Sequence, residues 1–194
     1  MSLRISQRQQ RFASLGGFRD ALHRHDLAEG LRPTHVSLSE VLWWTTAVED
    51  DLRNADPTYD TARAADPRAV ALPGIRYVRN FATHHAVAVT EVGAGGLTIP
   101  FTIPFTIPTE RMYWLPFDEL PKPTSKTPKK YLDEQQASCR EHMEGRRTVD
   151  VLDVAGTWLE ARMGRLLAVP DASEPVTPEM QKWFEKYRRD SPQP

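Results

Sequence analysis

The sequence from residue 37 to residue 54, SLSEVLWWTTAVEDDLRN, decides the fold class. Four of its apolar residues recur at helical intervals: Val41, Trp44, Val48 and Leu52. Such spacing places one face of a helix in a core. Ser37 and Glu40 have the spacing of a capping box, which predicts that the helix begins at about residue 38. We therefore expect a buried amphipathic helix over about 38–54.

The far end of this predicted helix is acidic, with Glu49 and Asp50 in its last turns. Two interpretations are open. The acidic end can be solvated, or Glu49 or Asp50 can reach an arginine of residues 76–85 and fix it in place as a second layer of support for a site there.

Three further helices are predicted over about 74–88, 129–145 and 148–167. A connector with a short helical piece, which ends at Pro73 and Gly74, links the helix over 38–54 to the first of them. The last helix carries an apolar stripe: Leu152, Ala155, Leu159 and Met163. Together with the helix over 38–54, these segments predict a mainly α-helical core.

Between the helices the period changes from helical to alternating, which predicts a β-hairpin or extended strap over about 86–116. AVAVTEV alternates, GAGG is typical of a turn, and residues 97–108 read LTIPFTIPFTIP, with an apolar residue at every odd position. RMYWLP then predicts a return strand.

The prolines of the repeat, Pro100, Pro104 and Pro108, are spaced so that all remove donors from the same edge of an extended chain. This predicts an edge strand or a polyproline-like strap. Its apolar face can cover the core of one subunit, or residues 97–108 can contact a second subunit or a protein partner.

The organisation we expect is an N-terminal helical extension over 1–36, a helical domain with a β insertion over 37–170, and a C-terminal helix and tail over 171–194. His23 and His25, two residues apart, would face different sides of a helix. We expect both histidines to be solvated and to bind no metal.

The composition is that of an ordinary soluble protein, with 40% hydrophobic and 26% charged residues and a net charge of -1. No apolar run approaches the roughly 20 residues of a membrane helix, and the N-terminus lacks the apolar region of a secretory signal. We expect a cytoplasmic protein with no membrane partner. The single cysteine, Cys139, excludes an internal disulfide framework. Any nucleic-acid binding must come from a local patch, because the whole chain carries little charge.

Residues 76–85 read RYVRNFATHH and combine side chains that a plain core helix does not need. On a continuous helix Asn80 and His84 are neighbours, so the amide can fix the imidazole. Histidine, with a pKa of about 6.5, can take a proton from a ribose hydroxyl. Arg79 offers planar charged donors to a phosphate. Together they could cleave RNA without metal, leaving a 2′,3′-cyclic phosphate.

The same residues, an arginine followed by a polar residue and by a histidine further along a helix, resemble the R-x(4–6)-H motif of the HEPN superfamily. The resemblance implies a helical bundle, metal-independent endoribonuclease activity in toxin or phage-defence settings, and a homodimer whose two motifs meet. It implies that His84 is the general base, with His85 as the alternative histidine. Arg79 would stabilise the phosphorane, and Asn80 would orient the histidine.

Residues 38–165 are also similar, through LPGIRYVRNFATHH, IPTERMYWLPFDELP and EHMEGRRTVDVLDVAGTWLEA, to an uncharacterised family of small bacterial proteins. That likeness implies a layout and no activity. Arg76 can be a second phosphate contact or an exposed charge, and Arg79 can be a structural charge. The alternative function is a non-catalytic HEPN-like module that binds a nucleic acid, a nucleotide or a protein. We expect no cofactor and no metal, because no phosphate loop or metal-ligand spacing is present in the sequence.

Overall fold

The computed structural model describes residues 6–28, 31–82, 87–96, 106–122, 129–168, 177–182 and 185. Within these residues the fold is mainly α-helical with a two-stranded antiparallel sheet, as the sequence predicts. In chain order the elements are α1 (Gln7–Asp26), α2 (Leu31–Ala55), α3 (Tyr59–Ala65), η1 (Pro67–Ala69), α4 (Leu72–Ala82), β1 (Ala88–Gly96), β2 (Thr106–Trp114), η2 (Phe117–Glu119), α5 (Lys129–His142) and α6 (Thr148–Ala168).

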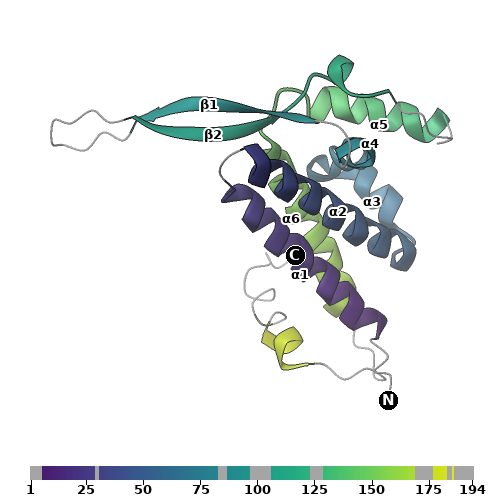
Figure 1. Cartoon of the computed structure of the whole chain (residues 1–194). Coiled ribbons are helices and arrows are strands. Elements are labelled where there is room, and N and C mark those ends of the chain that lie inside the picture. The colour runs from purple at the N-terminus through teal and green to yellow at the C-terminus, as the bar shows by residue number, and fades with distance from the viewer. Residues whose placement is uncertain are drawn as a thin grey trace.

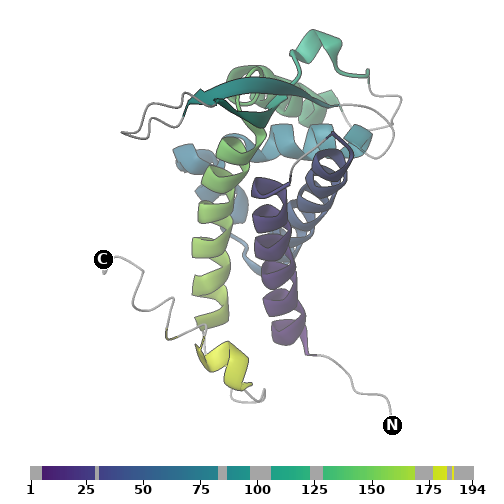
Figure 2. The same ribbon diagram turned by 60° about the vertical axis from the view of Figure 1, so that its left-hand side comes forward.

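The long helices α1, α2 and α6 stand side by side and share one core, with α4 and α5 packed together across one end of them (Figure 1). The β1–β2 hairpin lies at that same end and extends beyond the helices, as the second view also shows (Figure 2). None of the helices in the described part of the chain combines the length and apolar character needed to cross a bilayer.

The N-terminal segment predicted as an extension forms α1, and α1 is part of the bundle. Leu15, Phe18 and Ala21 are fully buried in the common core. The contact with α6 is so close that a Cβ added at Gly156 would lie 2.5 Å from Cζ of Phe18. Residues 7–26 are therefore part of the packed core of the bundle.

Helix α2 begins at Leu31, so the predicted start at about residue 38 is wrong. Ser37 lies inside the helix, where its hydroxyl donates to the carbonyl oxygen of Thr34 at 2.9 Å and caps nothing. Pro33 does not stop the helix, because a proline in the first turn lacks only an N–H that would have no helical acceptor. The predicted core stripe starting at Val41 is confirmed in its buried members Val41, Val48 and Leu52, and Trp44 packs against it half-buried.

The later helices follow the predicted layout, with one correction. Helices α5 and α6 match the predicted 129–145 and 148–167, and the stripe expected on α6 is buried throughout. Gly145, where the sequence predicts a stop, has a φ of +66°, a left-handed backbone that suits glycine. Helix α4 ends at Ala82, however, and β1 has begun by Ala88, so a helix extending to 88 is wrong.

The hairpin is confirmed, but its turn is not where the sequence places it. Gly93 to Gly96, the GAGG segment, belong to β1 and pair with Thr109 to Thr106. Glycine and alanine are weak strand formers, which is why the sequence suggests a turn. Residues 97–105, which hold most of the LTIPFTIPFTIP repeat, lie outside the described residues. Of residues 97–108, for which the sequence suggests contact with a partner, the structure describes only Thr106, Ile107 and Pro108, which lie in β2. The partner contact stays a prediction.

The outer edge of β2 is closed at its base by the connection between α5 and α6. The N–H of Trp114 donates to the Arg146 oxygen at 3.0 Å, and the Gly145 N–H donates to the Trp114 oxygen at 3.2 Å, so the main chain of Trp114 faces away from β1. Alternate residues of a strand face the same edge, so Pro108 also faces outward, and its missing N–H spares the β1–β2 ladder. The predicted one-sided effect of the prolines holds for Pro108. Pro100 and Pro104 lie outside the described part of the chain.

His25 joins three helices and is 3% exposed, so the expectation of a solvated residue is wrong for it. Its Nδ1 lies 3.0 Å from the Ser37 hydroxyl of α2, and its Nε2 lies 2.8 Å from the Thr148 hydroxyl at the start of α6. Burial lowers the pKa of His25 to about 4, although the nearby charge of Asp26 opposes this shift. The side chain is thus a neutral polar link inside the bundle.

Candidate functional site on helices α2 and α4

Helix α4, which carries Arg76, Arg79 and Asn80, is held at both ends by hydroxyl groups of other helices. At its start the N–H of Gly74 donates to the Ser138 hydroxyl of α5 at 3.0 Å, and that hydroxyl donates to the Val70 oxygen at 2.6 Å. At its end the Ser39 hydroxyl of α2 donates to the Ala82 oxygen at 3.2 Å. These bonds satisfy main-chain groups that a helix leaves unpaired at its ends.

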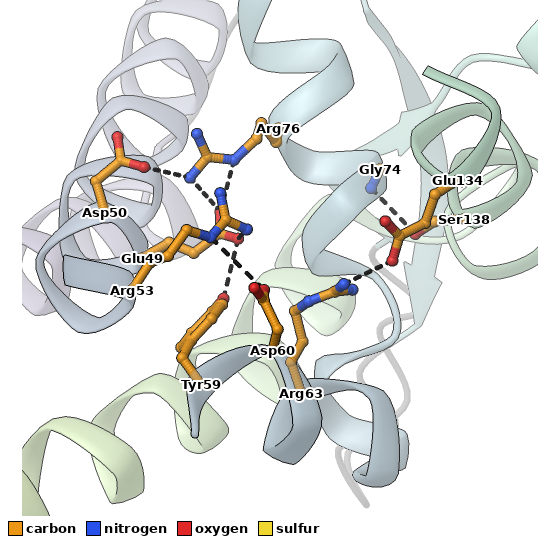
Figure 3. A network of polar contacts seen from close by, with 10 residues as sticks. All are labelled: Glu49, Asp50, Arg53, Tyr59, Asp60, Arg63, Gly74, Arg76, Glu134 and Ser138. Atoms are coloured by element: carbon orange, nitrogen blue, oxygen red, sulfur yellow. Dashed lines mark hydrogen bonds and ion pairs between the residues drawn. The ribbon is translucent and has the colours of Figure 1, made fainter. Parts of the chain in front are cut away.

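The centre of the site is Glu49, a carboxylate that is 2% exposed and accepts hydrogen bonds from three residues (Figure 3). The Tyr59 hydroxyl donates to Oε1 at 2.9 Å, and Arg53 donates to the same oxygen at 3.1 Å. Arg76 donates to Oε2 from Nε at 3.0 Å and from Nη2 at 2.8 Å. A buried carboxylate needs such partners, because an unpaired charge in a core is strongly unfavourable.

Arg76 is the arginine that the acidic end of α2 reaches. Its guanidinium also donates to Asp50 at 2.6 Å, so it bridges two consecutive acidic residues. Burial alone would lower the pKa of Arg76, but the charges of Glu49 and Asp50 outweigh burial and raise it. Of the two interpretations of this acidic end, contact with an arginine of residues 76–85 is confirmed, and the arginine is Arg76. Arg76 is therefore occupied by an internal ion pair.

The network continues from Glu49 toward α3 and α5. Nε of Arg53 lies 3.7 Å from Oδ1 of Asp60 on α3. Nη2 of Arg63, also on α3, lies 2.6 Å from Oε1 of Glu134 on α5. Burial, with the charge of Glu49 added, raises the pKa of Tyr59, so its hydroxyl remains a donor at any physiological pH. These contacts link α2 to α3 and α4, and α3 to α5 (Figure 3).

Arg79 and Asn80 lie one turn beyond Arg76 on α4 and are not part of this network. Asn80 is exposed and Arg79 is partly exposed. Within the described residues Arg79 makes no hydrogen bond or ion pair, whereas Arg53, Arg63 and Arg76 are all paired with carboxylates. The structure therefore separates the two arginines of the RYVRN segment: one is internal and paired, and the other faces outward.

Trp43 is a candidate that the sequence analysis did not single out. Helix α4 contacts α2 at two points, where Arg76 pairs with Glu49 and where Ala82 accepts from Ser39. Trp43 lies on α2 between these two points, as Arg79 does on α4, and the Trp43 side chain is 50% exposed. It packs edge-on against Trp44, with ring centroids 4.6 Å apart. The sequence does contain a sign of this residue, because Trp43 lies outside the apolar stripe of its helix, where a large aromatic side chain gains little from packing in the core.

His84 and His85 lie outside the described residues, since the description of this segment ends at Ala82 and resumes at Val87. The predicted hydrogen bond between Asn80 and His84, and the choice between His84 and His85, both stay predictions. The structure brings Arg76, Glu49 and Asp50 together and leaves Asn80 exposed and Arg79 partly exposed, one turn further along α4.

Two other places in the described part of the chain were possible sites. Cys139 is buried, and burial raises the pKa of its thiol to about 12, which leaves it an inert core residue. A surface pocket of about 440 Å³ lies between α1 and α6, lined by Arg19, Leu22, His23, Asp26, Val149, Asp150 and Asp153. No group of three or more potential metal ligands is present among the residues that were described.

Comparison of the chain with protein-family models, with curated proteins and with solved structures gives no match. The resemblance to the HEPN superfamily therefore stays a prediction from residues 79–85, and the likeness to a family of small bacterial proteins stays a prediction from residues 38–165.

Proposed function

We propose that the exposed end of α4 binds RNA and cleaves it without a metal, with Arg79 contacting the phosphate and a histidine of residues 84–85 acting as general base. The observation that carries this proposal is that Arg79 is accessible and has no carboxylate partner among the described residues, while the neighbouring arginines have one. A guanidinium in this state can donate two parallel hydrogen bonds to a phosphate.

The residues beneath Arg79 support the proposal through charge. Two acidic side chains close to a phosphate site would repel the ligand, but Glu49 and Asp50 are both bonded to Arg76. The ion pair neutralises part of that negative charge and holds α4 against α2. In this scheme Arg76, Glu49 and Asp50 position the helix, and Arg79 makes the contact with RNA.

Trp43 supports RNA over a small phosphate ligand. An exposed aromatic ring gives an unpaired base a surface on which to stack, and such stacking is typical of single-stranded RNA recognition. The Trp43 ring is half-exposed on α2, a helix that packs against α4. Phosphate contact at Arg79 and base stacking at Trp43 would then hold one nucleotide between α2 and α4.

The test is cleavage of a mixed RNA pool by the purified protein in excess EDTA, with analysis of the product ends. Wild type is expected to leave 2′,3′-cyclic phosphates. Arg79→Ala, His84→Ala and His85→Ala are prepared identically, and the histidine whose loss abolishes cleavage is the base. Arg165→Ala is the matched control, because it removes an exposed arginine of α6 and should cleave as wild type does.

A second function, RNA binding without cleavage, is supported by the exposed Asn80 and the partly exposed Arg79, which can contact RNA whether or not a histidine acts on it. Filter binding of the same RNA pool separates the two functions. Retained RNA with intact length, lost in Trp43→Ala and Arg79→Ala, would identify a binding module. RNA that is neither bound nor cut would contradict both functions.

A further inference from the structure

The side of α2 that contacts α4 carries a histidine, His35, in its second turn. Ser39 of this side donates to the Ala82 oxygen at the end of α4. Glu49, further along α2, pairs with Arg76. At about 3.6 residues per turn, His35 projects between Ser39 and Glu49 around the axis of α2. His35 therefore belongs to the side of α2 that faces α4.

The contact between the two helices becomes more exposed toward His35. Thr46 and Glu49 are 7% and 2% exposed, whereas Ser39 and His35 are each partly exposed. The main-chain oxygen of His35 accepts from Ser39, but its ring takes no part in a hydrogen bond or ion pair with the residues that the structure describes. His25, in contrast, is buried and bonded through both ring nitrogens. The His35 imidazole is thus available to a ligand, while the His25 imidazole is a structural link.

One hydroxyl group fixes the main chain of His35 relative to the end of α4. Oγ of Ser39 lies 3.1 Å from the His35 oxygen and 3.2 Å from the Ala82 oxygen, so these two carbonyl groups are close together. Arg79 lies one turn before Ala82 on α4, and His35 lies one turn before Ser39 on α2. The phosphate-binding arginine of the proposed function and His35 therefore lie within one helical turn of the same contact.

We propose that His35 is the general acid of the RNA cleavage and donates a proton to the 5′-oxygen that leaves the phosphorus. This inference rests on the proposed function. In that reaction the 2′-oxygen bonds to phosphorus and gives its proton to the base, and the bond between phosphorus and the 5′-oxygen breaks. His35 enters the step as imidazolium and ends it as neutral imidazole, so the leaving oxygen departs as a hydroxyl group. Histidine suits this role because it can hold or release a proton near neutral pH.

The test uses the nature of the leaving group. Wild type and His35→Gln are compared on two forms of one single-stranded RNA oligonucleotide, taken from a site that wild type cuts in the mixed pool. In the second form sulfur replaces the 5′-oxygen of the scissile bond, and a thiolate leaves without a proton donor because it is a much weaker base than an alkoxide. His35→Gln should cleave the oxygen form about 100-fold more slowly than wild type or worse. It should cleave the sulfur form at close to the wild-type rate.

Two variants serve as controls for this comparison. His142→Gln removes another partly exposed histidine, on α5, and should cleave both forms as wild type does. Arg79→Ala should be slow on both forms, because the phosphate contact is needed whichever atom leaves.

The outcomes separate this inference from the proposed function. A His35→Gln variant that cleaves the oxygen form at the wild-type rate would overturn the acid role and leave the proposed function intact. Equal losses on the two forms would also overturn it, since they would show that His35 supports binding or structure. A wild type that cuts no RNA in the pool would overturn both.

Discussion

Glu49 is the single residue on which the arrangement around the candidate site depends. Its two oxygens accept from side chains of α2, α3 and α4, and each of those donors reaches it from a different direction. When one partner of a buried charge network is removed, the remaining charges are left without compensation, and the loss exceeds the net value of the network itself.

We expect Glu49→Gln to lower the free energy of unfolding by about 2–4 kcal/mol, because Arg53 and Arg76 lose a shared buried counter-charge while the side-chain shape is kept. Urea unfolding measures the loss. The control is Asp60→Asn, whose side chain is 72% exposed and lies 3.7 Å from Arg53, and which should change stability by no more than about 0.5 kcal/mol. Equal effects of the two substitutions would show that the network is not centred on Glu49.

His25 gives the bundle a pH dependence of a definite sign. Ser37 donates its proton to Thr34 and so accepts from Nδ1–H, which leaves Nε2 to accept from the Thr148 hydroxyl. This assignment describes a neutral imidazole. A protonated ring would need the Thr148 proton turned to the Met112 oxygen, a weaker bond at 3.4 Å, and would place a charge inside the bundle.

The pKa of His25 is about 4 in the fold against 6.5 in the unfolded chain, so the unfolded chain binds more protons between these values. Stability from this residue is complete above pH 6.5 and is lost as the pH falls toward 4. The free energy of unfolding, measured with urea, should fall between about pH 7.5 and about pH 5, and the fall should be about 2 kcal/mol larger in wild type than in His25→Gln. An identical pH dependence in the two proteins would contradict a neutral buried His25.

At this scale the sequence predicts some residues well and others not at all. The acidic end of α2 and the arginines of α4 invite an ion pair, and Arg76 forms it with Glu49. His25 could not be predicted, because its burial depends on hydroxyl groups of Ser37 and Thr148 that are far from it along the chain. The pattern within α1 gives no sign of these two hydroxyl partners, whereas the charges at the end of α2 do suggest a partner of opposite charge.

The packing of α1 against α2 is an element-scale property that two adjacent glycines can test. A Cβ at Gly17 would lie 2.6 Å from the Trp44 ring, whereas a Cβ at Gly16 would meet nothing within 4 Å. We expect Gly17→Ala to destabilise the protein by about 1–3 kcal/mol through forced separation of the helices. Gly16→Ala should stabilise it by about 0.5–1 kcal/mol, because alanine is the better helix former.

Thermal or urea unfolding of both variants gives the comparison. Both substitutions add the same methyl group to the same helix, so helix propensity cancels between them and the difference reports packing alone. A stabilised Gly17→Ala would mean that Trp44 moves aside at little cost and that α1 is not tightly registered on α2.

The elements themselves were predictable where a periodic pattern runs over several turns, as in α2, α5 and α6. Their boundaries were less so. The start of α2 was misplaced because Ser37 and Glu40 mimic a cap, although helical backbone already precedes them. The GAGG segment was misplaced because its pairing with β2 is supplied by the opposite strand and not by its own propensity.

At the scale of the whole molecule the candidate site and the ribbon are separate parts. The site residues lie on α2 and α4, and only the surface position of Arg79, not its isolation from the carboxylates around it, could be expected from the sequence. Glu49 and Asp50 pair with Arg76, and which arginine of α4 they meet depends on how α4 packs against α2, which the sequence of either helix does not give.

The ribbon should be removable without unfolding the bundle. Its described residues that belong to the common core are all at its base: Val87, Ala88, Met112 and Trp114. We expect a chain in which residues 91–111 are replaced by a short glycine-serine turn to keep the helical circular-dichroism spectrum and to unfold within about 1 kcal/mol of wild type, as for changes away from a core. The same chain should keep whatever activity α4 has toward RNA, because α4 lies outside the replaced residues. Trp114→Ala is the contrasting change, since its side chain is 2% exposed within the core, and it should cost about 3–5 kcal/mol. Loss of helical structure in the shortened chain would mean that the ribbon helps to hold the bundle together.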